Sequence, residues 1–129
     1  MNTLTPTQQQ KILTRTFSSI GHPVEDHADL MLMFYAGMVN ELKNSPDFDN
    51  LEDSFENFMN SPDSDAPGQQ LLDLYNLFES HNLEEDITEA FYAYLNRYIN
   101  HLRPTLTEKQ KKETQNILDD TAKLMQTDA

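Results

Sequence analysis

The 129-residue chain has no cysteine, no tryptophan, only three glycines, and no Lys or Arg between residues 44 and 96. Without cysteine it has neither a disulfide framework nor a thiolate that could bind zinc or act as a nucleophile. The three glycines are not grouped, so there is no glycine-rich loop to cradle a phosphate. No apolar run is long enough to cross a bilayer as a helix, and the N-terminus lacks the apolar core of a secretory signal. A cytoplasmic protein is therefore expected.

The lack of basic residues concentrates the negative charge in one block of the sequence. Residues 44–96 carry 13 Asp or Glu, which equals the formal net charge of −13 of the whole chain. Eight of the twelve aromatic residues fall in the same block, so much of it is expected to pack against a core. A disordered acidic tail is disfavoured on this ground, and the carboxylates are expected to form a fixed surface.

Hydrophobic periodicity predicts helices throughout the chain. Residues 5–8, with sequence TPTQ, combine a capping threonine with a proline at the first helical position, and Gly21 marks the end of the helix that follows. A second helix is predicted from residue 23 or 24 to residue 43. It is apolar around its middle turns, which is typical of a central, buried helix.

Further helices are predicted in the second half of the chain. They are a third helix over about residues 50–60, a fourth that follows a loop over 61–68 and ends near 81–82, a fifth that ends at Pro104, and a sixth that begins after it. The fifth is expected to bury a face made of Ile87, Phe91, Tyr94, Tyr98 and Leu102. No segment alternates like a strand, so the predicted fold is a single all-α domain over residues 1–129, an irregular bundle of about five to six helices.

No motif typical of a catalytic or metal site is present. The four histidines, at positions 22, 27, 81 and 101, match neither the Glu-x-x-His nor the His-Glu-x-x-His spacing of helical metal sites. Asp63, Asp65 and Gly68 fit three positions of a calcium-binding EF-hand loop, but Leu74 stands where the loop requires a bidentate glutamate. We therefore predict no metal, no cofactor and no catalytic residue, and expect that the protein is not an enzyme.

Two carboxylate pairs supply the one enzymatic alternative. Asp53-x-x-Glu56 and Asp86-x-x-Glu89 resemble the paired carboxylates of the all-α, magnesium-dependent nucleoside triphosphate pyrophosphatases. The resemblance covers four residues and implies a magnesium site and a nucleotide substrate. In that family the order is Glu-x-x-Glu and then Glu-x-x-Asp, and the acidic block has no Lys or Arg to bind a triphosphate. We rank this hypothesis below a binding function.

The leading hypothesis is a non-enzymatic binding protein that docks a carboxylate-rich face on a basic surface of a partner protein. If that surface normally binds nucleic acid, the chain acts as a DNA mimic or inhibitor. Direct binding of nucleic acid is disfavoured because phosphate contacts need a basic face. The residues predicted to contact the partner are Asp47, Asp49, Glu52, Asp53, Glu56, Asp63, Asp65, Glu84, Glu85, Asp86 and Glu89.

Two alternatives remain open. The first is an adaptor or chaperone-like helical module, able to self-associate, that binds through an apolar face. It is suggested by methionines at positions 31, 33, 38 and 59, since methionine suits adaptable surfaces. In the second, the acidity serves solubility alone, which predicts acidic excess over the whole surface rather than in one block.

Overall fold

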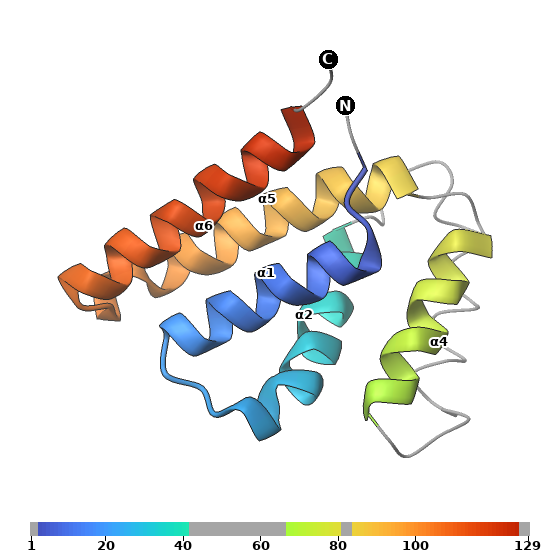
Figure 1. The fold of residues 1–129 in the computed structure, drawn as a ribbon, viewed down its shortest axis with the longest axis horizontal. Helices are drawn as coiled ribbons and strands as arrows, with labels where there is room; N and C mark the ends of the chain where they lie inside the picture. The colour runs from blue at the N-terminus through green and yellow to red at the C-terminus, as the bar shows by residue number, and fades with distance from the viewer. Residues whose placement is uncertain (1–2, 42–66, 81–83, 127–129) are drawn as a thin grey trace.

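The computed structural model describes residues 3–41, 67–80 and 84–126, and in these ranges the chain forms five α-helices, two short 3-10 turns and no strand (Figure 1). In chain order the elements are α1 (Pro6–Ser19), η1 (Val24–Asp26), α2 (His27–Glu41), α4 (Pro67–Ser80), α5 (Glu84–Leu102), η3 (Arg103–Thr105) and α6 (Glu108–Gln126). The prediction of an all-α, single-domain bundle is confirmed. The helix predicted over residues 50–60 lies outside the described residues.

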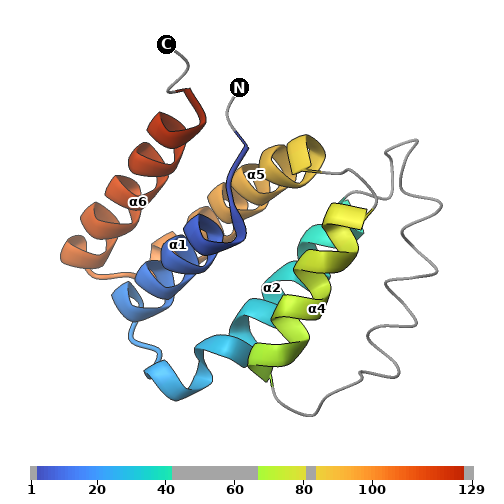
Figure 2. The same ribbon diagram turned by 45° about the vertical axis from the view of Figure 1, so that its right-hand side comes forward.

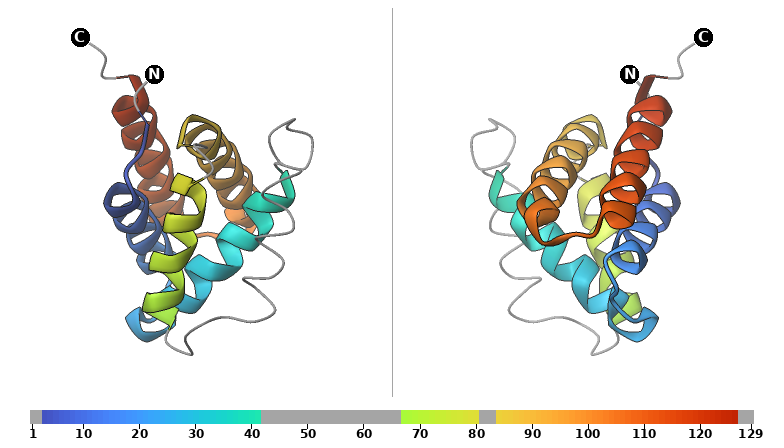
Figure 3. Two further views of the ribbon diagram at one scale, coloured as in Figure 1. Left: turned by 90° about the vertical axis from the view of Figure 1, so that its right-hand side faces the viewer. Right: turned by 90° about the vertical axis from the view of Figure 1, so that its left-hand side faces the viewer.

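The helices pack in a bundle of unequal members. α5 and α6 form an antiparallel hairpin, and α1 packs against α6 (Figure 1). α2 packs against both α4 and α5, and Figure 2 shows α4 running beside it. In Figure 3, α1 and α6 lie on one side of the molecule and α2 and α5 on the other. Each helix therefore has a face against the common core.

Both ends of α1 have the structure that the sequence predicts. The Oγ1 atom of Thr5 accepts a hydrogen bond from the backbone N–H of Gln8 over 3.1 Å, and Oε1 of Gln8 accepts one from the N–H of Thr5 over 2.9 Å. These bonds satisfy two donors that a helix start leaves unpaired. At the other end Gly21 has a φ angle of 91°, and the N–H of His22 reaches the carbonyl of Phe17 over 2.9 Å. This is a Schellman motif, and it needs glycine because an L side chain rarely adopts that φ.

The predicted boundaries of α2 and α4 require two corrections. The α-helical part of α2 begins at His27, later than predicted, because residues Val24–Asp26 form a 3-10 turn in which the N–H of Asp26 bonds to the carbonyl of Pro23. The predicted loop over 61–68 is wrong at its end, since α4 already begins at Pro67. Proline suits the first position of a helix because its missing N–H would have no helical partner there.

α6 begins with a second capping box. The Oγ1 atom of Thr107 accepts from the N–H of Gln110 over 3.1 Å, and Oε1 of Gln110 accepts from the N–H of Thr107 over 2.9 Å. The helix therefore restarts at Glu108, shortly after Pro104 as the sequence predicted, with η3 as the connection.

One apolar core joins all five helices. Its largest fully buried side chains include Phe17 from α1, Tyr35 from α2, Leu74 from α4, Phe91 from α5 and Ile117 from α6. Burial of an apolar side chain such as Phe17, Leu74 or Ile117 stabilises the fold by roughly 1.5–3 kcal/mol through removal of its surface from water. The prediction that α2 is the central helix agrees with its five buried apolar side chains, which are Met31, Phe34, Tyr35, Met38 and Val39.

The buried face of α5 differs in part from the predicted one. Ile87 and Phe91 are buried as expected, but the row continues through Leu95 and Ile99. The predicted Tyr94, Tyr98 and Leu102 are only half-buried, and the two tyrosines pack at the edge of the core. A tyrosine at that position can keep its hydroxyl near water, whereas leucine and isoleucine gain more from complete burial.

Candidate interaction surface

The predicted partner-binding residues divide between two parts of the chain. Glu84, Glu85, Asp86 and Glu89 belong to the first two turns of α5. The remaining seven lie outside the described residues, and they are Asp47, Asp49, Glu52, Asp53, Glu56, Asp63 and Asp65.

The start of α5 presents its carboxylates to solvent. Glu85 and Glu89 are exposed and Asp86 is half-buried. Glu85 and Glu89 are four residues apart, so they lie on the same face of the helix with roughly 5–6 Å between their Cβ atoms. Among the described residues, none of these three carboxylates has a Lys or Arg partner within ion-pair distance. Within the described part of the chain, the start of α5 therefore carries three carboxylates without an ion-pair partner.

Helix stability explains only some of the acidic residues at the start of α5. Carboxylates in the first turn stabilise a helix because the backbone dipole is positive there, and Glu84, Glu85 and Asp86 occupy that turn. Glu89 lies beyond it, and its i,i+4 pairing with Glu85 is destabilising by roughly 0.2–0.5 kcal/mol. The charge on this face thus exceeds what the helix alone requires.

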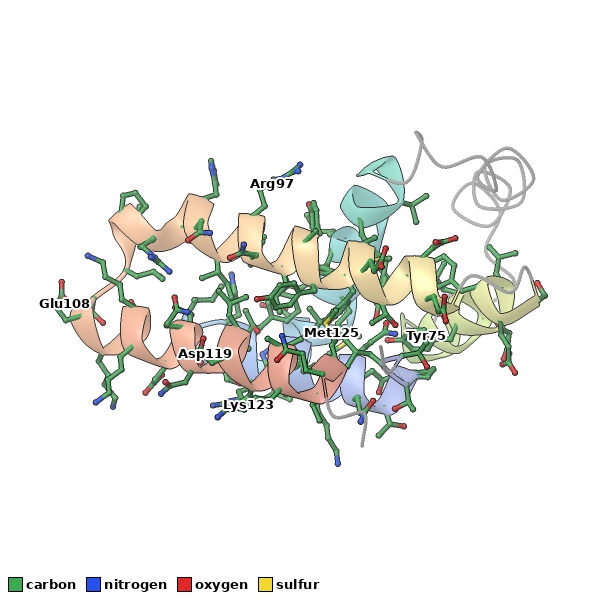
Figure 4. The ribbon with its side chains drawn as sticks, turned by 90° about the horizontal axis from the view of Figure 1, so that it is seen from above. Tyr75, Arg97, Glu108, Asp119, Lys123 and Met125 are labelled. Atoms are coloured by element: carbon green, nitrogen blue, oxygen red, sulfur yellow. The ribbon has the colours of Figure 1, made fainter. Side chains whose placement is uncertain are left out.

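The nearest concentration of lysines lies at the other end of α5. Lys109, Lys111 and Lys112 belong to the first turns of α6, beside the turn between the two long helices. Figure 4 shows Glu108 at this end of the bundle and Tyr75, on α4, at the opposite end. α5 has 19 residues and is roughly 28 Å long, which exceeds the screening length of about 8 Å at physiological salt. These three lysines are therefore too far away to pair with Glu85 or Glu89.

The charges of α6 are largely balanced within the helix or by α1. Nζ of Lys111 lies 3.3 Å from a carboxylate oxygen of Glu108, and Arg15 on α1 donates to Asp120 over 2.7 Å. Both pairs are exposed, and such pairs contribute at most about 1 kcal/mol. These two ion pairs therefore neutralise part of the charge on α6.

The histidines form no metal site in the described part of the chain. No group of three or more His, Asp and Glu lies close enough together there to hold a metal ion. His27 is buried at the start of α2, with its ring 5.7 Å from that of Phe17 and its Nε2 atom 3.1 Å from the carbonyl oxygen of His22. Sequence reasoning missed this burial, although His27 precedes the buried Met31 and Tyr35 at four-residue spacing. His81 lies outside the described residues.

A buried polar network connects α1, α2 and α4. The hydroxyl of Tyr35 donates to Oε1 of Gln9 over 2.6 Å and lies 3.0 Å from the hydroxyl of Tyr75. Burial raises the pKa of Tyr35 well above 10.0, and the neighbouring Tyr75 adds to the shift. Burial also raises the pKa of Tyr75, partly offset by its hydrogen bonds to Tyr35 and Gln10. Both phenols are therefore neutral donors and acceptors at physiological pH, and their role here is structural.

The methionines that suggested an apolar binding face separate into two groups. Met31 and Met38 are in the core, whereas Met33 is 69% exposed on α2. Met33 borders a groove of about 140 Å³ between α2 and α5, together with Tyr94 and Tyr98. The ring of Tyr94 lies 4.8 Å from that of Phe34 beneath it. Met59 lies outside the described residues.

Comparisons with protein-family models, with curated protein sequences and with solved structures found no match for the chain. Each helix in the described ranges is too short or too polar to cross a lipid bilayer. Interpretation of the site therefore depends on its own geometry and charge.

Proposed function

We propose that the protein is a non-enzymatic binding protein whose acidic helical surface docks on a basic surface of a partner protein that binds nucleic acid. The observation that carries this proposal is the start of α5, where exposed carboxylates with no described basic partner stand on a helix fixed to the core. Ile87, Thr88 and Phe91 of the same turns are all buried. The charge is therefore held in position rather than carried on a flexible tail.

Fixed charge suits recognition of a basic surface. Complementary fields accelerate encounter and set the orientation of the two proteins. Carboxylates on rigid helices can occupy positions that phosphates occupy in a bound nucleic acid, and a partner covered in this way would lose access to its nucleic acid. The sequence between residues 44 and 96 adds further carboxylates and no Lys or Arg.

The direct test is capture of a partner from a nuclease-treated lysate of the source organism at low and at high salt. The proposal predicts a basic, nucleic-acid-binding protein that is retained at low salt, released at high salt and displaced by added DNA. Retention at high salt without competition by DNA would contradict it.

One observation favours a second function. The groove beside Met33 exposes apolar side chains between α2 and α5, as expected of an adaptor that binds an apolar helix or a second copy of itself. Under this alternative, replacement of Met33 by Glu would abolish association, whereas loss of the α5 carboxylates would leave it unchanged. Comparison of the Met33 variant with a variant that lacks the α5 carboxylates therefore distinguishes the two proposed functions.

A further inference from the structure

A second hollow lies at the end of the bundle where α1 and α5 begin and α4 ends. It has a volume of about 240 Å³, and its described walls include Leu4, Gln9, Tyr75, Phe78 and Ile87. A cavity of about 150 Å³ is large enough to hold a benzene ring. This pocket therefore has room for an aromatic ring and a short chain attached to it.

Three polar side chains in the walls, those of Gln9, Tyr75 and Thr5, already form hydrogen bonds within the protein. Gln9 donates from Nε2 to the carbonyl of Leu4 over 2.9 Å and accepts from Tyr35 at Oε1. The Tyr75 hydroxyl lies 3.0 Å from that of Tyr35, and Thr5 uses its side chain to cap α1. An occupant therefore gains little from polar groups deep in the pocket, and the rest of the wall favours an apolar one.

The charge at the rim of the pocket indicates which charge the exposed end of a ligand should carry. Glu79, which is exposed, is the only charged side chain among the described lining residues. α4 and the first half of α5 contain no Lys or Arg, so a carboxylate or phosphate on the occupant would be repelled. A cation near the rim would be attracted to Glu79.

We infer that this pocket binds a small apolar group that carries a primary ammonium, of the size of an arylalkylamine. The apolar part enters between Leu4, Phe78 and Ile87, and the ammonium remains at the rim beside Glu79. Free amines and the lysine side chain of a peptide share this chemistry. The inference depends on the pocket alone and needs no protein partner, so its test is independent of the proposed function.

The test is a titration of the full chain, labelled at its methyl groups, with three probes followed by NMR. The probes are phenethylamine, the neutral 2-phenylethanol and the anionic 3-phenylpropanoate. We expect saturable shifts at the methyl groups of Leu4 and Ile87, with the amine bound about threefold more tightly than the alcohol and the acid bound most weakly. Absence of saturable shifts at these methyl groups, or equal binding of acid and amine, would overturn the inference.

Two variants test whether Glu79 causes the preference for the amine over the alcohol. Glu79→Gln is expected to remove the preference for the amine over the alcohol, and the exposed position makes loss of folding unexpected. Glu89→Gln makes the same change at an exposed position of α5 that does not line the pocket, and should keep the preference. A parallel titration with Nα-acetyl-lysine-N-methylamide distinguishes the sources, since tighter binding than phenethylamine identifies a peptide side chain as the occupant. If Glu79→Gln keeps the preference, the inference is wrong.

Discussion

The backbone N–H of Leu4 donates a hydrogen bond of 2.9 Å to Oγ1 of Thr88, which joins the segment before α1 to α5 across 84 residues of sequence. The carbonyl of Leu4 accepts from Nε2 of Gln9 over 2.9 Å, so side chains satisfy both backbone groups of this buried residue. The arrangement holds the Leu4 side chain in the core and shapes one wall of the pocket beside it.

Replacement of Thr88 by Val should therefore destabilise the protein. Valine fills nearly the same volume but leaves the buried N–H of Leu4 without that acceptor, at a cost of about 1–3 kcal/mol in the free energy of unfolding. Urea denaturation followed by circular dichroism measures it. The matched control is Thr121→Val, because Thr121 is equally buried and its hydroxyl bonds only to the carbonyl of Ile117 in its own helix. Equal losses in the two variants would show that the Leu4 bond contributes nothing.

Replacement of Tyr35 by Phe tests the buried network. The change removes the donor to Oε1 of Gln9 and the neighbour of the Tyr75 hydroxyl, so the free energy of unfolding should fall by about 1–3 kcal/mol. The control is Tyr92→Phe, where the side chain is only half-buried and the expected change is smaller. A Tyr35→Phe protein as stable as the original would mean that water or other groups replace the lost partners.

The same tyrosine makes stability depend on alkaline pH. Because burial raises the pKa of Tyr35 well above 10.0, the folded protein keeps a proton that the unfolded chain releases near pH 10. The corresponding stability is fully present below about pH 10 and is lost as the pH rises beyond it. Urea midpoints measured from neutral pH upward should fall above pH 10, and fall less steeply in Tyr35→Phe. The remaining dependence would come from Tyr75 and Tyr98, whose pKa values burial also raises.

The effect of Gly37→Ala on stability should depend on whether Tyr94 is present. A Cβ atom at this position would overlap the hydroxyl of Tyr94, so Gly37→Ala should destabilise the original protein or displace that ring. In a Tyr94→Ala background the obstacle is gone, and the same change should stabilise the helix by up to about 1 kcal/mol through the greater helix propensity of alanine. Urea denaturation of the two single variants and the double variant gives the change in the free energy of unfolding caused by Gly37→Ala in each background. Destabilisation of equal size in both backgrounds would contradict the close packing.

Local sequence signals predicted the ends of several helices because the groups that form those ends are close in sequence. The capping box of Thr5 and Gln8 and the positive φ of Gly21 depend on neighbouring residues alone. The loop predicted over 61–68 is wrong at Pro67 because proline and glycine occur both in turns and in first turns of helices, and only the position of the next helix decides between them.

Contacts between distant residues could not be predicted in this way. Periodicity placed Tyr94 and Tyr98 on the buried face of α5, yet the core row passes through Leu95 and Ile99, because α2 and α6 determine the orientation of α5. The bond from Leu4 to Thr88 and the pocket between α1, α4 and α5 likewise depend on tertiary packing. For the interaction surface, the sequence predicted which residues are acidic, and the fold adds that Glu85 and Glu89 share an exposed helix face.

The measurement that tests the proposed function most directly compares two triple variants for binding to the captured partner. Glu85→Gln, Asp86→Asn and Glu89→Gln together neutralise the start of α5, whereas Glu25→Gln, Asp26→Asn and Asp29→Asn together remove the same charge from exposed positions at η1 and the start of α2. Both variants lose carboxylates near a helix start, so their stabilities should fall by similar amounts.

The proposal predicts that association at low salt slows about tenfold or more for the α5 variant and changes little for the other, with unchanged circular dichroism in both. Equal association rates for the two variants would contradict a binding surface at α5.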